Sequence, residues 1–418
     1  METNDPSLSA THSIDTQESI WRFVPAGEYR PPESTVQATV RSSLADFIVG
    51  LRKRSEPEQP VFKAVDTLRA LSSWMLRRTA PEIEWSAAAA ALAAALNEWS
   101  HNETPDSPAI IVLGPPHSGT RPIVELWASQ QGLPILEPPS PEQILQQDRS
   151  WLEMLPREDG PWVLPALEKC YLRNLRGLSL VRAFFDAVMS GAYGRCVIAC
   201  DTWAWAFLSH IWYGRVSRRI QLQALSEAEL ATWFQQLASH GGSSRYAFRQ
   251  SDNGAYVLLA PDEHNGESGS AARSDYLSHL AIYSRGIAGV AWATWRQSLL
   301  ADPDELPKEG EESNGQDGDS SGATTIWVSP WERVNRPSLP KLRRREQAFV
   351  LHALLLHGGL SADLLLQVLP LSGYDIVQTL LALQAAGFVL NEADVWQVTP
   401  LAYPEARRIL RAEGYLVD

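Results

Sequence analysis

The hydrophobic pattern is clearest in the centre of the chain. Residues 109–113 and 196–200 are short, continuous apolar runs, which are typical of strands buried on both faces of a parallel sheet. Residues 122–131 and 179–190 predict helices, and Pro122 suits the first turn of the former. Because strands alternate with helices, this region predicts an α/β domain with a parallel sheet. Shorter apolar runs at 133–136 and 162–166 are further candidate strands.

The sequence before this centre is polar at first and then helical. The first twenty residues are polar and acidic, a composition typical of disorder. Residues 42–54 predict a helix with an apolar face, and residues 60–101 predict two more. The second of these, 86–99, is an alanine and leucine run with high helix propensity.

Helical patterns return after residue 220. Ser226 fits a helix N-cap, with Glu229 three residues later as its capping-box partner. Residues 245–260 interrupt the helices with a predicted hairpin that turns at 252–254. Residues 275–300 predict a helical segment broken near Gly286.

The last part of the chain predicts a small separate unit. Residues 301–323 are acidic and rich in Gly, Ser and Asn, which indicates a flexible linker. Three short helices, two short strands and a last helix are predicted at 344–357, 361–368, 373–386, 388–390, 395–398 and 404–413. Three helices followed by a hairpin are typical of a winged-helix domain. The chain thus divides into a mostly disordered or extended N-terminal segment (1–60), an α/β domain with N-terminal helices (61–219), a helical unit with an inserted hairpin (220–300), the linker (301–323) and the winged-helix domain (324–418).

Composition narrows the class of protein. Hydrophobic residues make up 44% and charged residues 20% of the 418 residues, a balance that supports a globular core. The net charge of -13 makes the whole molecule a poor match for a nucleic acid. No uninterrupted apolar run of eighteen residues predicts a membrane span. The three cysteines and the absence of a signal-peptide pattern indicate a reducing, cytoplasmic compartment.

The loop between the first central strand and its helix carries the candidate chemistry. In phosphate-binding loops, glycines let backbone N–H groups approach the phosphates, a lysine neutralises their charge, and a following hydroxyl helps hold Mg²⁺. The loop resembles the Gly-Pro-Pro-Gly-x-Gly-Lys-Ser/Thr motif of AAA+ ATPases at Gly114, Pro115, Pro116, Ser118 and Gly119. It departs from the motif at His117 in place of a glycine, Thr120 in place of the lysine, and Arg121 in place of the hydroxyl. The alternative interpretation is a Gly/Pro turn that binds nothing.

Two further segments extend the resemblance. Residues 196–201 resemble a Walker B strand, which implies that Asp201 would coordinate Mg²⁺, but Thr202 stands where the family carries its catalytic glutamate. Asp201 also fits a helix N-cap. Residues 219–226 resemble the start of an AAA+ lid, and Arg285 would then be the lid arginine that senses nucleotide, or an ordinary surface arginine. The resemblance implies a P-loop NTPase fold that binds ATP or ADP.

The predicted recognition helix of the winged-helix domain does not resemble a DNA reader. Residues 373–386 contain no Lys or Arg, and residues 341–418 hold seven basic against eight acidic residues. A helix in the major groove needs donors for base edges and cations for phosphates. The composition therefore favours a protein partner over DNA.

Two hypotheses of function follow. In the first, the chain is a degenerate AAA+ or STAND-like pseudo-ATPase that binds nucleotide with little or no hydrolysis. It would act as a scaffold or regulatory subunit through contacts with another protein or by self-assembly. In the second, it is an active ATPase that regulates DNA transactions through the winged helix. The sequence leaves open whether nucleotide binds at all.

Overall fold

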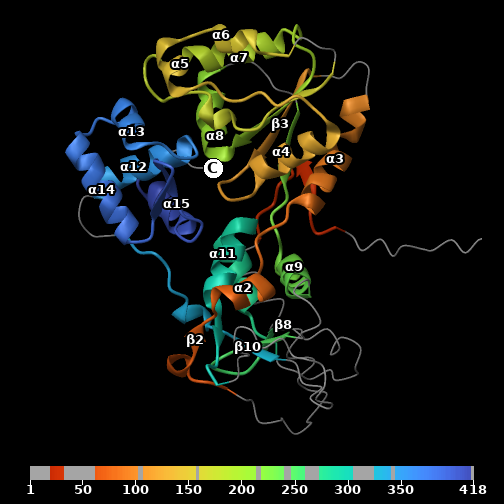
Figure 1. Cartoon of the computed structure of the whole chain (residues 1–418), viewed down its shortest axis with the longest axis vertical. Coiled ribbons are helices and arrows are strands. Elements are labelled where there is room, and N and C mark those ends of the chain that lie inside the picture. The colour runs from red at the N-terminus through yellow and green to blue at the C-terminus, as the bar shows by residue number, and fades with distance from the viewer. Residues whose placement is uncertain are drawn as a thin grey trace, which may run out of the picture.

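The structure, a computed structural model, describes residues 19–32, 62–101, 107–156, 160–212, 218–239, 246–258, 273–304, 324–339 and 344–415. The helix predicted at 42–54 and most of the predicted linker lie outside these residues. Figure 1 shows an α/β domain at the top, a second sheet at the bottom and a C-terminal helical module on the left. No helix among the described residues is long and apolar enough to cross a membrane.

The first sheet has the order β1-β6-β3-β5-β4. Its strands are β1 (Phe23–Pro25), β3 (Ala109–Gly114), β4 (Trp162–Leu164), β5 (Cys196–Asp201) and β6 (Arg218–Leu222). β6, β3, β5 and β4 run parallel, and β1 joins the edge of β6 in the antiparallel sense. A single parallel bridge from Ile135 to Val163 stands where a strand was predicted at 133–136. The predicted α/β domain with a parallel sheet is confirmed.

Both faces of this sheet are covered, as the continuous apolar runs predict. Ala109, Ile111 and Leu113 pack into the core shared with α7 (Ser179–Met189) and α8 (Thr202–Ile211). Ile110 and Val112 pack into the core shared with α3 (Ser86–His101) and α4 (Thr120–Gln131). Successive side chains of a strand point to opposite faces, so both sets are buried. The domain is completed by α5 (Pro141–Gln146), α6 (Ser150–Glu153) and the short 3-10 helix η2 (Leu167–Lys169).

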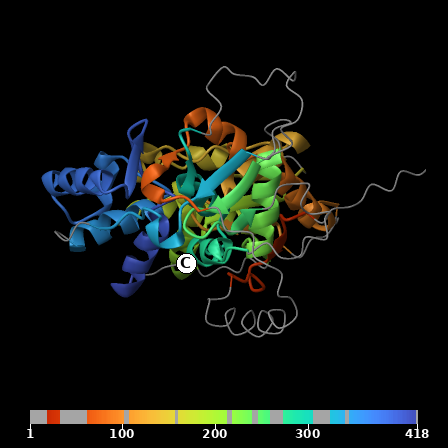
Figure 2. The ribbon, with the colours of Figure 1, turned by 90° about the horizontal axis from the view of Figure 1, so that it is seen from below.

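A second sheet has the order β2-β9-β10-β7-β8. Its strands are β2 (Arg69–Ala70), β7 (Tyr246–Gln250), β8 (Tyr256–Leu258), β9 (Leu299–Ala301) and β10 (Thr324–Val328). The accompanying helices are η1 (Val65–Thr67), α2 (Ser73–Thr79), α9 (Glu227–Ser239), α10 (Tyr276–Ser284), α11 (Ala288–Ser298) and η4 (Trp331–Arg333). Figure 2 shows this sheet from below, with blue β10 beside green β7.

This second sheet corrects the interpretation of residues 220–300 as a helical unit with a hairpin. The predicted hairpin is present as β7 and β8, but β2, β9 and β10 extend it. β10 was assigned to the C-terminal unit, whereas it pairs in parallel with β7. The strands come from segments far apart in sequence, so no local pattern links them. The short strands β2 and β9 are also too brief to show a period of two.

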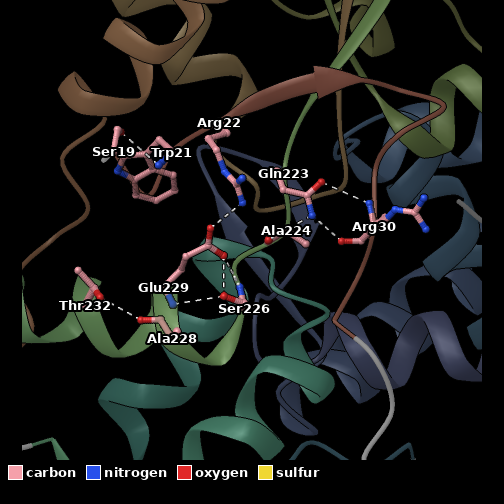
Figure 3. A network of polar contacts seen from close by, with 10 residues as sticks. All are labelled: Ser19, Trp21, Arg22, Arg30, Gln223, Ala224, Ser226, Ala228, Glu229 and Thr232. Carbon is pink, nitrogen blue, oxygen red and sulfur yellow. Dashed lines mark hydrogen bonds and ion pairs between the residues drawn. The ribbon is translucent and has the colours of Figure 1, made fainter. Parts of the chain in front are cut away.

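The start of α9 is tied to the N-terminal strand. The predicted capping box is present, since Ser226 N–H donates to Glu229 Oε2 at 2.8 Å and Glu229 N–H donates to Ser226 Oγ at 3.3 Å. Arg22 pairs with Glu229 Oε1 at 2.9 Å (Figure 3). Nearby, Gln223 Nε2 donates to the carbonyl of Arg30 at 2.6 Å. These contacts hold β1 against the edge of β6.

The C-terminal module spans residues 344–415. It consists of α12 (Arg344–Leu356), α13 (Ala362–Val368), α14 (Gly373–Ala385), β11 (Val389–Glu392), β12 (Val395–Val398) and α15 (Tyr403–Ala412), close to the predicted elements. Its buried side chains share one core with the α/β domain. Tyr171 Oη donates to the carbonyl of Leu356 at 2.8 Å, and Trp203 Nε1 donates to Tyr403 Oη at 3.1 Å. The module is therefore docked on the α/β domain.

The Trp203–Tyr403 hydrogen bond provides a test of this docking. Tyr403→Phe should lower the free energy of unfolding by about 1 to 2 kcal/mol, because it leaves a buried indole N–H without this acceptor. Tyr283→Phe is the matched control, since its hydroxyl makes only a 3.4 Å contact to the Leu401 carbonyl. Urea denaturation would measure both losses. Equal losses in the two variants would contradict a specific contribution from the Trp203 contact.

Candidate functional site

The loop at residues 114–121 follows β3 at the carboxyl edge of the first sheet. Gly114 stands opposite Asp201 in the parallel register of β3 and β5, so the loop and the predicted Walker B acid are neighbours. α4 begins at Thr120, two residues earlier than its apolar pattern predicted, with Gly119 as its N-cap. The first N–H groups of a helix have no partner within the helix, and this end carries partial positive charge. The arrangement is suited to an anion.

Two hydroxyls close the base of the loop. Ser118 Oγ and Thr120 Oγ1 are hydrogen-bonded to each other at 2.8 Å. A Cβ placed on Gly114 would overlap both oxygen atoms, so this position accepts only glycine without a shift. Thr120, which replaces the expected lysine, thus turns its hydroxyl back over Gly114. The hydroxyls stabilise the loop itself.

Gly119 is required for a different reason. Its φ of +82° lies in the left-handed region, which non-glycine residues rarely adopt. A Cβ there would also overlap ring carbons of Trp85, which lies just before α3. Trp85 in turn contacts Trp21 edge to face, with ring centroids 5.8 Å apart. Gly119 is therefore needed because the absence of a side chain allows the Trp85 indole ring to pack directly against the loop backbone.

His117 connects the loop to α11 and to α15 of the C-terminal module. It adopts a φ of +66°, where the AAA+ motif has a glycine. Its carbonyl accepts a hydrogen bond from Gly289 N–H of α11 at 3.0 Å. Its ring packs edge to face on Tyr403 of α15, at 5.8 Å between centroids. Burial lowers the pKa of His117 to about 4, with the Val398 carbonyl as an opposing contact, so the ring is neutral at pH 7.

Arg121 lies at the rim of the site. Its Nε donates to Glu125 Oε1 at 2.7 Å, one helical turn further along α4, and its side chain is about half exposed. The guanidinium is therefore near the loop but held towards solvent. It does not occupy the place of the missing lysine.

Asp201 has the N-cap role that the sequence allowed. Its Oδ1 accepts the N–H of Trp203 at 2.8 Å at the start of α8. Its own N–H donates to Glu168 Oε2 at 3.2 Å. Asp201 thus lies beside the loop with one carboxylate oxygen engaged by α8.

Glu168 and Lys169 were not recognised in the sequence as site residues. Lys169 Nζ donates to the carbonyls of Gly358 and Gly359 at 2.8 and 3.1 Å, and so joins η2 to the C-terminal module. Burial raises the pKa of Glu168 and lowers that of Lys169. A signal was available, because both follow the candidate strand at 162–166, and side chains after parallel strands gather at one sheet edge.

These residues surround a cavity of about 490 Å³, here called the loop cavity. The loop, Asp201, Glu168 and Lys169 line it together with the indole rings of Trp85, which lies against Gly119, and Trp292. Gly358, Gly359, Gln397, Val398 and Pro400 of the C-terminal module form a further wall. Of the predicted site residues, positions 114–121 and Asp201 come together in this cavity.

Arg285 does not line the loop cavity. It is the C-cap of α10 and adopts left-handed backbone geometry, with a φ of +56°. The following Gly286 packs closely on the backbone of Leu225. The structure therefore does not bring Arg285 to the cavity as a nucleotide sensor would require.

The donors around the loop suit a phosphate better than a magnesium ion. Helix N–H groups, Lys169 and Arg121 offer positive charge to the cavity. Mg²⁺ uses one or two carboxylates together with phosphate oxygens, and Asp201 and Glu168 would be its protein ligands. No group of three His, Cys, Asp or Glu side chains suited to a metal occurs among the described residues.

Comparisons with known proteins show only distant likeness. No protein-family model matches the chain, and no curated protein matches its sequence. Among solved structures, RuvB of Thermotoga maritima, described as a Holliday junction branch migration motor, is 13% identical with a TM-score of 0.30, over 74% of this chain and 88% of RuvB. The Walker-type ATPase of Pyrococcus abyssi is 12% identical with a TM-score of 0.30, over 80% and 97% of the two chains. Cdc6p of Pyrobaculum aerophilum is 14% identical with a TM-score of 0.30, over 77% and 92%. Likeness at this level says nothing about activity or ligands, and these descriptions apply to those proteins alone.

Proposed function

We propose that this protein is a degenerate AAA+-like P-loop protein that binds ATP or ADP in the loop cavity with little or no hydrolysis. It acts as a scaffold or regulatory subunit through protein contacts. The observation that carries the proposal is the loop cavity itself. There, a strand-loop-helix that keeps two glycines of the motif, Gly114 and Gly119, lies beside the acid at the end of β5. Thr120, in place of the lysine, hydrogen-bonds to Ser118 within the loop.

The size and lining of the loop cavity support a nucleotide as ligand. Its volume of about 490 Å³ lies within the usual range for small-molecule sites. Its lining combines the α4 N-terminus, Lys169 and Arg121, which suit phosphates, with the indole rings of Trp85 and Trp292, which suit an aromatic base. Bound nucleotide would therefore contact the α/β domain, α11 and the C-terminal module together.

The groups around the loop argue against efficient turnover. Catalysis of phosphoryl transfer depends on positioned charge around the outer phosphate and on a residue that orients water. The lysine is replaced by Thr120, whose hydroxyl bonds Ser118, and Arg121 pairs with Glu125. Asp201 is followed by Thr202, which cannot accept a proton from water at neutral pH.

The C-terminal module, which we interpret as a winged-helix domain, offers a face suited to a protein partner. On α14, Tyr374, Val377 and Leu381 are 68%, 46% and 49% exposed and recur at helical spacing. Leu366 of α13 is 42% exposed and adjoins the start of α14. The sequence has no Lys or Arg between Arg345 and Arg407, so this face lacks the cations that DNA binding requires.

A second candidate function is active ATP hydrolysis in support of DNA transactions. It is favoured by Glu168 and Lys169, which supply a buried acid and a cation in the loop cavity from η2 instead of from the motif positions. Steady-state turnover that Asp201→Ala abolishes, together with a salt-dependent shift of DNA, would favour this candidate over the first.

Binding of a fluorescent ADP analogue carrying a methylanthraniloyl group tests the proposed function. We expect saturable binding to the wild-type protein and at least about tenfold weaker binding to Gly114→Ala. The substitution should disturb a charge-assisted contact between the loop and a phosphate, and the loss of such a contact costs about 1.5 to 3 kcal/mol. The added methyl group must displace the Ser118 and Thr120 hydroxyls. Gly160→Ala is the matched control, since a Cβ there meets nothing within 4 Å. Absence of binding by the folded wild-type protein would refute the proposal.

A further inference from the structure

A second cavity of about 450 Å³ lies where the C-terminal module meets the α/β domain. On the side of the α/β domain it is bounded by the prolines that precede and begin α5, by Ile144 and by Tyr171. On the side of the module it is bounded by residues 357–364 and 393–395. Arg121, Glu168, Lys169 and Gly359 line both this cavity and the loop cavity, so the two adjoin.

Most of the wall of the second cavity is apolar. Prolines 138, 139 and 141 and Ile144 line it from the α/β domain, and Leu360, Leu364 and Val395 line it from the module. Such a lining with few polar groups, at a boundary between two structural units, is the usual composition of a small-molecule site. The body of a ligand here would therefore be apolar.

His357 is a buried polar group that lines this cavity. Its side chain is only 1% exposed, and its ring packs on Tyr171 with centroids 4.7 Å apart. Among the described residues neither ring nitrogen has a partner in good hydrogen-bonding geometry, although the backbone of Glu168 lies close enough to the ring to oppose the lowering of its pKa. Buried polar atoms nearly always have a partner, so the ring nitrogen that does not meet the Glu168 backbone points to a donor or acceptor supplied by a ligand or by ordered water.

Two cations give the cavity a positive end. Lys169 uses two of its three ammonium donors on the carbonyls of Gly358 and Gly359, which leaves one for a further acceptor. Arg121 binds Glu125 through Nε, so the two terminal nitrogens of its guanidinium remain for another contact at the mouth. Glu168 is already engaged by the N–H of Asp201, and Asp394 lies at the exposed rim.

We propose that the second cavity binds a small organic anion with an apolar body. Its acidic group lies at Lys169 and Arg121, its body lies against the prolines and Leu364, and a polar group on it pairs with His357. This site adjoins the proposed nucleotide site and shares Lys169 and Arg121 with it, whereas the proline wall, Leu364 and His357 belong to the second cavity alone. Because Lys169 also holds Gly358 and Gly359, a ligand anion that draws on this ammonium would act directly on the contact between the module and the α/β domain.

Two naphthalene probes test this inference with the full chain. The anion 1-anilinonaphthalene-8-sulfonate carries an acidic group on an apolar body, and neutral N-phenyl-1-naphthylamine has the same body without charge. We expect one saturable site for the anion. Lys169→Met keeps most of the side-chain stem and should weaken binding of the anion about tenfold or more, with little effect on the neutral probe. Leu364→Trp fills the cavity and should block both probes.

The controls separate this site from other surfaces. Val377→Ser with Leu381→Ser removes exposed apolar side chains of α14 and should leave anion binding unchanged. Leu364 does not line the loop cavity, so Leu364→Trp should retain binding of the ADP analogue even though the anion no longer binds. The inference is wrong if anion binding survives both Lys169→Met and Leu364→Trp, or if only the α14 variant removes it. Equal affinity of the two probes would show an apolar cavity without recognition of an anion.

Discussion

Replacing Gly119 with alanine should lower the free energy of unfolding by about 3 kcal/mol and abolish ligand binding at the loop. Part of the loss, about 1 to 2 kcal/mol, comes from placing a Cβ on a residue with a φ of +82°. A further 1 to 3 kcal/mol or so comes from overlap of that Cβ with the Trp85 ring, which cannot move freely because it also contacts Trp21. Urea denaturation monitored by circular dichroism measures the change.

The chain offers a matched control at the other end of the same helix. Gly132 caps the C-terminus of α4 with a φ of +64°, and a Cβ there meets nothing within 4 Å. Gly132→Ala should therefore lose only the conformational part, about 1 to 2 kcal/mol. The double variant Gly119→Ala, Trp85→Ala should lose less stability than the sum of the losses in the two single variants, because the overlap with the indole ring is absent from it. The difference, the coupling energy, measures the steric part. Equal losses at Gly119 and Gly132, with no coupling to Trp85, would contradict a steric role for the indole.

The parts of the fold that were predicted well are those determined by local pattern. The continuous apolar runs located β3 and β5 to within one residue, since both faces of these strands are buried. The helices of the C-terminal module were located because their apolar spacing persists over two or more turns. The capping box at Ser226 was also recognisable, because its two members lie three residues apart.

The second sheet and half of the site depend on contacts between distant segments. β10 pairs with β7 more than seventy residues earlier in the chain, and the residues just before β10 have a composition that suggests only a linker. Lys169 meets Gly358 nearly two hundred residues away. No spacing rule links such residues, so the cation that lines the loop cavity could not be identified by inspecting the loop motif alone.

For the loop, the sequence identifies the residues that depart from the motif but does not show what those residues contact. The sequence indicated that Thr120 and Arg121 replace the usual lysine and hydroxyl. It did not show that Thr120 would bond Ser118 or that Arg121 would pair with Glu125. Similarly, His117 was noted as a departure from glycine, but its contacts with Gly289 and Tyr403 depend on how α11 and the C-terminal module pack on the loop.

The stability of the protein should fall steeply between pH 6.5 and 4.5. Burial lowers the pKa of His117 to about 4, and burial together with the positive charges of Lys169 and Arg173 lowers that of His357 to about 3. In the unfolded chain both imidazoles titrate near 6.5, so between these values the unfolded state binds more protons than the folded state. The free energy of unfolding therefore rises with pH in this window. The contribution is fully present above pH 6.5 and is lost as pH falls, by up to about 5 kcal/mol for both groups at pH 4.5.

The contribution of His357 can be isolated by substitution. Burial raises the pKa of Glu168, which has the opposite effect on stability at low pH, so the total change in the wild-type protein mixes both terms. His357→Phe keeps an aromatic ring against Tyr171 and removes one titrating group. When the pH falls from 7 to 4.5, the free energy of unfolding of the variant should decrease by about 2 to 3 kcal/mol less than that of the wild-type protein. Parallel stability curves for wild type and His357→Phe would show that His357 is not held neutral in the folded protein, because a histidine protonated equally in both states contributes no slope.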